Sequence, residues 1–438
     1  MLDMEKVVYI VHAVDTEGPL YESTAATFER LKASFGIELL PTYENILKLR
    51  RKEIDLGGKE EEVAKFLDPA LQTYNDSWDK IEAMHEKMLS DEFRFAHPDS
   101  EGNGWVFNWF CMDHVGYDYN PRHRDMGYHN IYDRYLEILD KYGRYKDDVQ
   151  FHFHPMSHYR EANRAGKSYE HSETLYQILS RRIIDRQFFP SAFRAGCVTE
   201  RPDANWFLEQ WIPFDCSNMA SDGFDKEIHK DQRNGQAGDW RRAPKDWSVY
   251  HPDIYDYQIP GNCHRTIGRF LNIVSRYGNI TSNEIENAFQ RARSGKPTLM
   301  GMFNHDFRNM INEHNYVQSL LQPIAKKYSD VKFVYSRAVD AFNAVLGNTI
   351  TEIELDVRLD GEDLSVKTLK GEVFGPQPYL AIKTKSGRYI HDEFDFGLDG
   401  KSWYYVFNDN MIRLEDVDII GIAANNVCGK QFVKIIKV

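Results

Sequence analysis

The sequence has few cysteines, and none of them forms a pattern typical of a disulfide framework or a cysteine zinc site. Five cysteines are scattered over 438 residues, and no CxxC pair occurs.

No run of 18 apolar residues is present, so no segment is long enough to cross a bilayer. The first apolar run ends at Asp15 and Glu17 rather than at small residues of a cleavage site, which favours a buried strand over a signal peptide. We therefore expect a soluble, cytoplasmic protein.

Basic residues are in the minority. The chain has 54 Lys and Arg against 67 Asp and Glu, a net charge of −13, and it contains no basic run. A surface of this sign repels phosphate backbones and anionic lipids, so we expect binding to neither nucleic acid nor a membrane surface. The hydrophobic share of 42% is ordinary for a globular chain and excludes wholesale disorder. The length predicts one large domain and a smaller one.

Short apolar runs alternate with amphipathic stretches from residue 6 to residue 347. The candidate strands are Val7–Val14, Trp105–Met112, Val149–His154, Ser191–Arg194, Ile212–Cys216, Pro297–Asn304 and Val331–Tyr335. Alternation of strands with helices implies parallel pairing through helical crossovers. We expect an α/β fold in which residues 1–347 form a distorted (β/α)7-type barrel.

Two insertions and a change of pattern complete the predicted organisation. Residues 20–100 are charged and helical in pattern, and residues 220–265 are rich in Trp, Tyr, Arg and Pro. Long loops on α/β scaffolds usually shape the binding face, although a solvated helical cover is the alternative for the first insertion. Residues 348–438 show short alternating runs between turn residues, which predicts a small antiparallel β-sandwich-like domain. Its expected role is structural packing, with sugar binding or oligomer contact as alternatives.

An acidic motif directly follows the first predicted strand. Asp15 and Glu17 stand two residues apart, so their side chains point the same way in an extended segment, and Gly18 follows them. The carboxyl end of a strand is where α/β folds place their active sites. Solvated acids at a polar transition from strand to loop are the alternative interpretation.

Three histidines lie within seven residues at the end of the third predicted strand. His152 and His154 share a strand face, whereas His154 and His158 have the i, i+4 spacing of a turn. Neutral imidazole is a favoured ligand of zinc, and buried imidazoles need partners. Two histidines and one carboxylate leave room for water, as in a catalytic metal site. We therefore expect a bound divalent metal, zinc first, with the histidine pair left open and the spare carboxylate as general base.

Three further strand ends carry polar side chains. Arg194 could pair with a carboxylate and hold it ionised. His305, followed by Asp306, could protonate a leaving group, and Asp215 could orient such a histidine. Each of these residues taken alone is more often structural.

In this order the motifs resemble those of the polysaccharide deacetylase superfamily, the NodB-homology or carbohydrate esterase family-four fold. Members of that family are distorted (β/α) barrels that remove acetyl groups from sugars with a bound divalent metal, commonly zinc. The resemblance implies that Asp15 is the general base and Glu17 a metal ligand. It also implies that His154 and His158 form the family's H-x-x-x-H motif.

The later motifs of the family have counterparts as well. The resemblance implies that Arg194 tunes the base, that Asp215 is the aspartate of the fourth motif and that His305 is the general acid. The chain departs from the family in three places. Its acids are separated by one residue, HFHP permits His152 and His154 as the ligand pair, and the fourth motif lacks its tryptophan. These departures are similar to those of a divergent branch found in surface-glycan (O-antigen or capsule) biosynthesis.

The expected function is hydrolysis of an acetyl or related acyl group on a sugar of a surface polysaccharide or its precursor. A metal-dependent amidohydrolase acting on a small non-sugar amide and a catalytically silent glycan-binding protein are the alternatives. The aromatic residues of the second insertion could stack on sugar rings, or they could form a small core of their own. They are Trp240, Trp247, Tyr250 and Tyr257.

Overall fold

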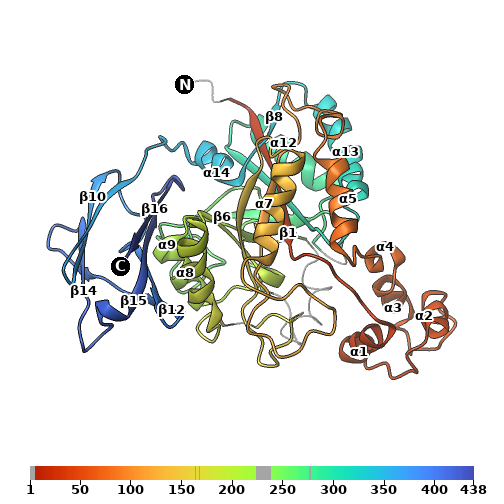
Figure 1. The fold of residues 1–438 in the computed structure, drawn as a ribbon. Helices are drawn as coiled ribbons and strands as arrows, with labels where there is room; N and C mark the ends of the chain where they lie inside the picture. Colours follow the sequence, from red (N-terminus) through yellow and green to blue (C-terminus); the bar gives the residue numbers. More distant parts are fainter. Residues whose placement is uncertain (1–4, 163, 167, 223–237, 276–277) are drawn as a thin grey trace.

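The computed structural model describes residues 5–162, 164–166, 168–222, 238–275 and 278–438. It contains a closed parallel β-barrel with helices around it and, toward the C-terminus, two antiparallel sheets (Figure 1). The expected α/β barrel with a β-sandwich-like C-terminal region is therefore confirmed.

The barrel is closed by strands in the order β2-β3-β4-β5-β6-β7-β1, with β1 pairing again to β2. The strands are β1 (Val7–Thr16), β2 (Phe107–Cys111), β3 (Asp148–Phe153), β4 (Ala192–Ala195), β5 (Phe214–Asn218), β6 (Thr266–Asn272) and β7 (Thr298–His305). Most of these strands are buried along their whole length, as in parallel sheets covered by helices. A further strand, β8 (Lys332–Tyr335), pairs with the first half of β1 outside the ring.

The seventh barrel strand is not the one predicted from the sequence. The barrel uses β6, whereas the predicted strand at residues 331–335 is β8. Arginines interrupt the apolar run around β6 and obscure it, yet both are buried in ion pairs. Arg265 pairs with Glu200 at 3.1 Å and with Asp215, and Arg269 pairs with Glu284 at 2.7 Å. Such ion pairs allow a strand with arginines to be buried. The partners lie elsewhere in the chain, so the sequence pattern of the strand does not show them.

Helices with one buried apolar face connect the strands and cover the barrel. They are α7 (Asn130–Tyr142), α8 (Thr174–Arg186), α9 (Pro202–Trp211), α12 (Ser282–Arg293), α13 (Met310–Lys327) and α14 (Ala338–Leu346). In α7 the buried residues Ile131, Tyr135 and Ile138 recur every three or four positions, the period of a helix that packs on one side. Among the described residues, no helix has the length and apolar character needed to span a membrane.

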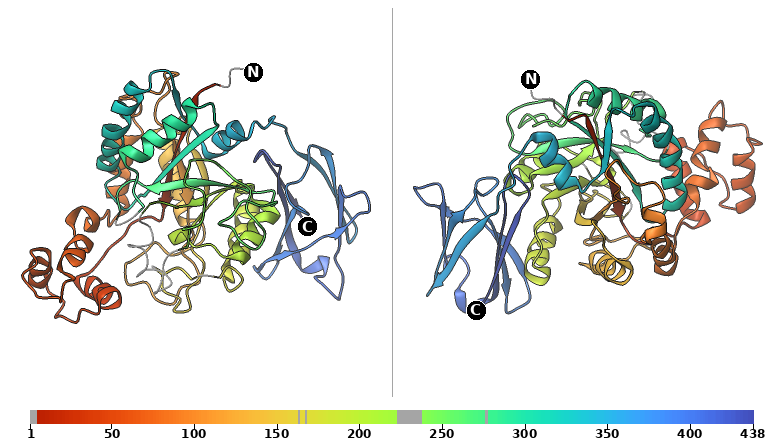
Figure 2. Two further views of the ribbon diagram at one scale, coloured as in Figure 1. Left: turned by 180° about the vertical axis from the view of Figure 1, so that it is seen from behind. Right: turned by 90° about the horizontal axis from the view of Figure 1, so that it is seen from above.

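The first insertion is helical, as its pattern predicts. It contains α1 (Thr24–Phe35), α2 (Tyr43–Arg50), α3 (Glu60–Phe66), α4 (Pro69–Gln72), α5 (Trp78–Met88) and α6 (Asp91–Arg94). Helices α1–α4 form a lobe that projects away from the barrel, whereas α5 packs beside α7 (Figures 1 and 2). The lobe has its own small apolar core, in which Phe28 and Leu31 of α1 meet Leu49, Val63 and Phe66.

Two four-stranded antiparallel sheets follow the barrel. The strands are β9 (Glu354–Asp360), β10 (Asp363–Lys370), β11 (Tyr379–Thr384), β12 (Tyr389–Asp392), β13 (Asp395–Phe396), β14 (Ser402–Val406), β15 (Val417–Asn425) and β16 (Gln431–Lys437). A shared apolar core lies between the sheets and includes Trp403 and Ile420. A second cluster joins Tyr379 of β11 to Ile183 of α8 and Trp211 of α9, so this region packs on the helices of the barrel.

A buried histidine in β1 makes the stability of the barrel depend on pH. Trp105 Nε1 donates to His12 Nδ1 at 2.9 Å, so the His12 Nε2–H is left to donate to Asn304 Oδ1 at 3.0 Å. Both ring nitrogens are satisfied in the neutral form, and burial lowers the pKa of His12 from 6.5 to about 4. Between these two pH values the unfolded chain binds a proton that the folded protein excludes, so stability falls as the pH falls.

We expect His12→Gln to remove this dependence. Between pH 7 and pH 4 the free energy of unfolding of the wild type should fall by about 3 kcal/mol more than that of the variant. Urea unfolding at a series of pH values measures the difference. His158→Gln, a change at an exposed side chain, is the matched control and should keep the wild-type slope. Parallel curves for wild type and His12→Gln would contradict the assignment.

Candidate metal centre

The acidic motif lies at the carboxyl end of β1, inside the mouth of the barrel. Asp15 and Glu17 are 3% and 4% exposed, so neither is a solvated surface acid. Directly after them the chain turns at Gly18, where φ is +70° and a β-carbon would lie 2.6 Å from the Ile131 side chain. The Asp306 carboxylate accepts the backbone N–H groups of Gly18 at 2.8 Å and of Glu17 at 3.1 Å. This pair of bonds fixes the turn that orients both acids.

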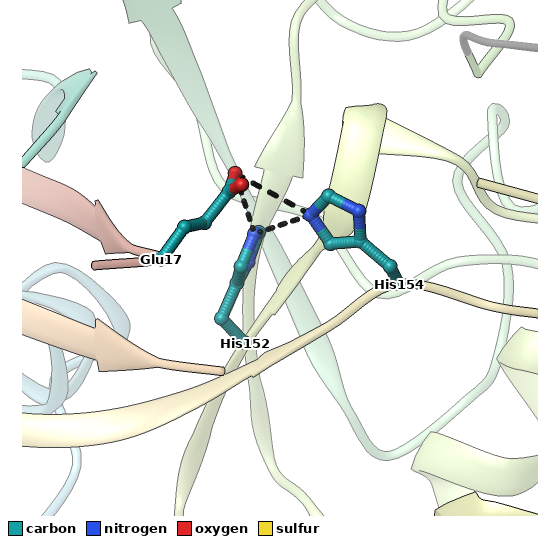
Figure 3. Close-up of side chains that lie close together, drawn as sticks. All are labelled: Glu17, His152 and His154. Atoms are coloured by element: carbon teal, nitrogen blue, oxygen red, sulfur yellow. Dashed lines mark hydrogen bonds and ion pairs between the residues drawn. The ribbon is translucent and has the colours of Figure 1, made fainter. Parts of the chain in front are cut away.

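Glu17, His152 and His154 converge on one point (Figure 3). The His152 and His154 Nε2 atoms are 3.1 Å apart. Glu17 Oε1 lies 3.5 Å from His154 Nε2 and 3.9 Å from His152 Nε2. Ligands around a tetrahedral zinc ion at about 2.0–2.2 Å stand about 3.3–3.6 Å from one another, so the three side chains have close to the spacing of a single-ion site.

The hydrogen bonding of His152 also suits a metal ligand. Its Nδ1 lies 2.9 Å from the backbone carbonyl oxygen of Arg194. A carbonyl only accepts, so Nδ1 carries the proton and Nε2 presents its lone pair toward Glu17 and His154. Fixing the tautomer through the second ring nitrogen is the usual arrangement of metal-binding histidines. The residues present therefore fit a divalent ion.

A glycine on the neighbouring strand end makes room for His154. A β-carbon on Gly196 would lie 2.0 Å from His154 Cδ2, closer than any side chain can approach. The predicted SAFRAG segment thus contributes both Arg194, whose carbonyl holds His152, and the gap that His154 fills. Both contributions follow from the parallel pairing of β3 with β4.

His158 lies outside this cluster. The structure brings together the strand-face pair, His152 and His154, rather than the i, i+4 pair. The strand β3 ends at Phe153, so His154 directly follows it, and His158 is exposed, with its ring near that of Tyr159. An i, i+4 spacing places two rings together only in a helix or a suitable turn, and residues 154–158 form no helix.

Each buried carboxylate is held by a guanidinium on one oxygen. Arg194 Nε donates to Asp15 Oδ1 at 2.5 Å, and an Arg124 Nη lies 2.6 Å from Glu17 Oε2. Burial opposes ionisation, but Arg194 with its neighbouring histidines lowers the pKa of Asp15 below its usual value. Arg124 and His154 likewise hold the pKa of Glu17 well below its usual range against the effect of burial. Both acids are therefore ionised at neutral pH.

His305 faces, on each of the two acids, the oxygen that no guanidinium binds. Its Nε2 lies 3.7 Å from Asp15 Oδ2 and 3.7 Å from Glu17 Oε1, and its side chain is 25% exposed. Burial lowers the pKa of His305 to about 4 despite the opposing effect of both carboxylates. The ring is therefore neutral near pH 7 and can accept a proton from a neighbouring group before passing it on.

Asp215 occupies a different place from the one proposed for it. It ion-pairs with Arg265, which also binds Glu200 at 3.1 Å and Asn205 at 2.8 Å. Burial, and after it the like charge of Asp215, raises the pKa of Glu200 well above its usual value. Asp215 therefore belongs to a buried polar network between β5 and the start of β6, and in this place it does not orient a histidine. Removing one partner from such a network typically costs stability rather than a catalytic step.

The four aromatic residues of the second insertion that were predicted to stack on sugars are core residues. Trp240 and Trp247 are 0% exposed and Tyr250 is 6% exposed. Their polar atoms are bound internally. Trp240 Nε1 donates to the Val198 carbonyl at 2.8 Å, and the Tyr250 hydroxyl donates to the Tyr257 carbonyl at 2.6 Å. The rings pack against protein instead of facing solvent, which argues against stacking on sugars. All four belong to the core cluster of the barrel rather than to a small core of their own. Part of this insertion, residues 223–237, lies outside the described residues.

A cavity of about 280 Å³ opens beside the cluster. Asp15, Glu17, His154, Arg194 and His305 line it from the strand ends. The helical lobe and the loop after β2 line it as well, through Arg30, Tyr74, Arg122 and Arg124. The first insertion is thus part of the wall of this cavity, in agreement with the expectation that long loops shape the binding face.

Arg124 is the residue of this centre that the sequence does not reveal. It lies in an irregular loop, within PRHRD, with no motif or period around it. Its carboxylate partner is more than a hundred residues away in the chain. The unusual density of arginine in that loop, Arg122 and Arg124 in an acidic protein, is the signal that could have pointed to it.

Comparisons with family models, curated proteins and solved structures returned no match to this chain. The resemblance to polysaccharide deacetylases therefore remains a prediction from the motifs.

The geometry predicts which histidines bind metal. The purified protein should hold one divalent ion per chain, and His152→Ala and His154→Ala should each weaken binding by at least 10-fold to 100-fold, the effect of disturbing a metal's ligand shell. His158→Ala is the matched control and should retain the wild-type content. Elemental analysis after dialysis against a dilute chelator measures all four proteins. Loss of metal from His158→Ala, with retention in His152→Ala, would contradict the site.

Proposed function

We propose that this protein is a metal-dependent hydrolase that removes an acetyl or related acyl group from a sugar. The single observation that carries the proposal is the convergence of three parts on one cavity. These parts are a Glu-His-His ligand set, a carboxylate held by an arginine, and a partly exposed histidine. Such a set supplies an open metal position, a base and a proton donor, which are the groups that acyl hydrolysis needs.

Glu17, His152 and His154 are the residues that would hold the ion. A divalent ion in this place supplies Lewis acidity, which polarises the acyl carbonyl and makes water a stronger nucleophile. Glu17 uses Oε1 toward the two histidines while Arg124 binds Oε2, so the carboxylate keeps one defined orientation. Three protein ligands leave a coordination position for substrate or water.

Asp15 is the general base in this mechanism. Arg194 fixes Oδ1, so Oδ2 is the oxygen that accepts a proton from the attacking water. The low pKa of Asp15 keeps it ionised and ready, although it makes the carboxylate a weak base. A carboxylic acid formed this way readily loses its proton again to a neighbour.

His305 is that neighbour. Its Nε2 lies 3.7 Å from Asp15 Oδ2, and the ring is neutral at pH 7 because burial lowers its pKa to about 4. The proton that His305 donates to the leaving nitrogen or oxygen of the sugar therefore comes from the attacking water by way of Asp15. The water proton reaches the leaving group, the hydroxyl group joins the acyl carbon, and acetate and the free sugar amine or alcohol result.

We expect Asp15→Asn and His305→Ala each to lower the rate of acyl release by at least about 10²-fold, the usual contribution of one general acid or base. Both variants should keep their bound metal, because neither residue belongs to the ligand set. Acetate release from a panel of N-acetylated and O-acetylated sugars measures the rate. His158→Ala should hydrolyse these sugars like the wild type.

The same assay separates the proposal from its alternatives. Ammonia released from small primary amides, with no acetate from any sugar, would replace it with an amidohydrolase. Wild-type rates in Asp15→Asn would show that another group is the base.

A further inference from the structure

The cavity beside the metal centre has the opposite charge to the chain as a whole. The protein carries a net charge of −13, yet the charged residues that line this cavity are five arginines and two acids. The arginines are Arg30, Arg122, Arg124, Arg194 and Arg308. Arg194 and Arg124 are engaged with Asp15 and Glu17, the two acids. Arg30 and Arg122 both pair with Glu22, which does not line this cavity.

Arg30 and Arg122 come from different parts of the chain and share one carboxylate. Arg30 of α1 donates to both Glu22 oxygens at 2.6 and 2.8 Å, and Arg122 of the loop after β2 pairs with Glu22 Oε2. Both arginines line the cavity, and Glu22, in the described structure, lines a separate smaller pocket instead. One carboxylate balances only one of the two positive charges, so the cavity face of this trio keeps a net charge of +1.

Both guanidinium groups stack on aromatic rings, and that of Arg122 also keeps an unused donor. Arg30 stacks on Phe66 at 4.6 Å, and Arg122 stacks on Tyr74 at 5.4 Å. Within the described ranges, Arg122 Nε is a buried donor with no hydrogen-bond partner. Burial and the neighbouring Arg30 cation both lower the pKa of Arg122. Two stacked cations held close together, one with an unused donor, favour an anion that can accept from both.

We propose that Arg30 and Arg122 form a binding subsite for an anionic group of the substrate, a phosphate or a carboxylate, next to the metal centre. As a statement about the substrate it rests on the proposed function, and it then names an acylated sugar that carries a phosphate or a carboxylate. The helical lobe supplies Arg30 and the barrel supplies Arg122, so the anion would also bridge the lobe and the barrel.

A purely structural tether is the competing explanation of the trio. In a tether, Glu22 is the anion that both arginines need, and its loss weakens the contact between lobe and barrel. In an anion subsite, Glu22 competes with the ligand for the same two cations. The two explanations therefore predict opposite consequences for anion binding when the Glu22 charge is removed.

The test is calorimetric titration of the purified protein at fixed ionic strength with three probes: glucose 1-phosphate, glucuronate and glucose. At least one of the anionic probes should bind more tightly than glucose. Arg30→Met and Arg122→Met should each weaken it about tenfold, and Glu22→Gln should strengthen it about tenfold. Arg51→Met removes an exposed charge from the same lobe and should leave the affinity unchanged.

The identity of the better probe decides between phosphate and carboxylate. Equal affinity for all three probes, or unchanged anion binding in both arginine variants, would overturn the subsite. Weaker binding in Glu22→Gln would also overturn it, in favour of the tether. Because none of these readouts requires hydrolysis, absence of acyl release would reject the proposed function and leave the subsite standing.

Discussion

Asp15 and Glu17 are two carboxylates buried beside each other, and burial of an unpaired charge costs several kcal/mol. In this site every oxygen of the two carboxylates has a partner that offsets the cost. Arg194 from β4 binds one oxygen of Asp15, and Arg124 from the loop after β2 binds one oxygen of Glu17. The other oxygens face imidazole nitrogens, that of His305 for Asp15 and those of His152 and His154 for Glu17. An ionised Glu17 beside two imidazole nitrogens is a donor set that suits a divalent cation.

Features with a short-range cause were predictable from the sequence, and features with a long-range cause were not. The barrel follows from alternating apolar strands and amphipathic helices. The two-residue period of a strand placed His152 and His154 on one face, because that geometry is local. The contact of Arg124 with Glu17 joins segments far apart in the chain, and no spacing encodes it. β6 was missed because Arg269 interrupts its apolar run, and the ion pair with Glu284 that allows this arginine to be buried is not visible in the sequence. Trp240 was predicted to bind sugar because its burial depends on the whole fold.

The helical insertion changes what the barrel mouth can recognise. The lobe of this insertion has its own core, so the insertion is more than a solvated cover. Arg30 and Tyr74 of the insertion line the cavity. The loop after β2 adds Arg122 and Arg124 from the barrel side. The result is a positive cavity in an acidic protein, which would steer an anionic ligand toward the metal centre while the remaining surface repels it.

The most direct test of this account is the position of the metal itself. Anomalous diffraction at the zinc absorption edge, from crystals of the protein grown with zinc, locates the ion without reference to activity. If Glu17, His152 and His154 hold the ion, a single strong peak lies about 2.0–2.2 Å from Glu17 Oε1, His152 Nε2 and His154 Nε2. A protein with no peak at this point, or with its ion bound by His158 instead, would contradict it.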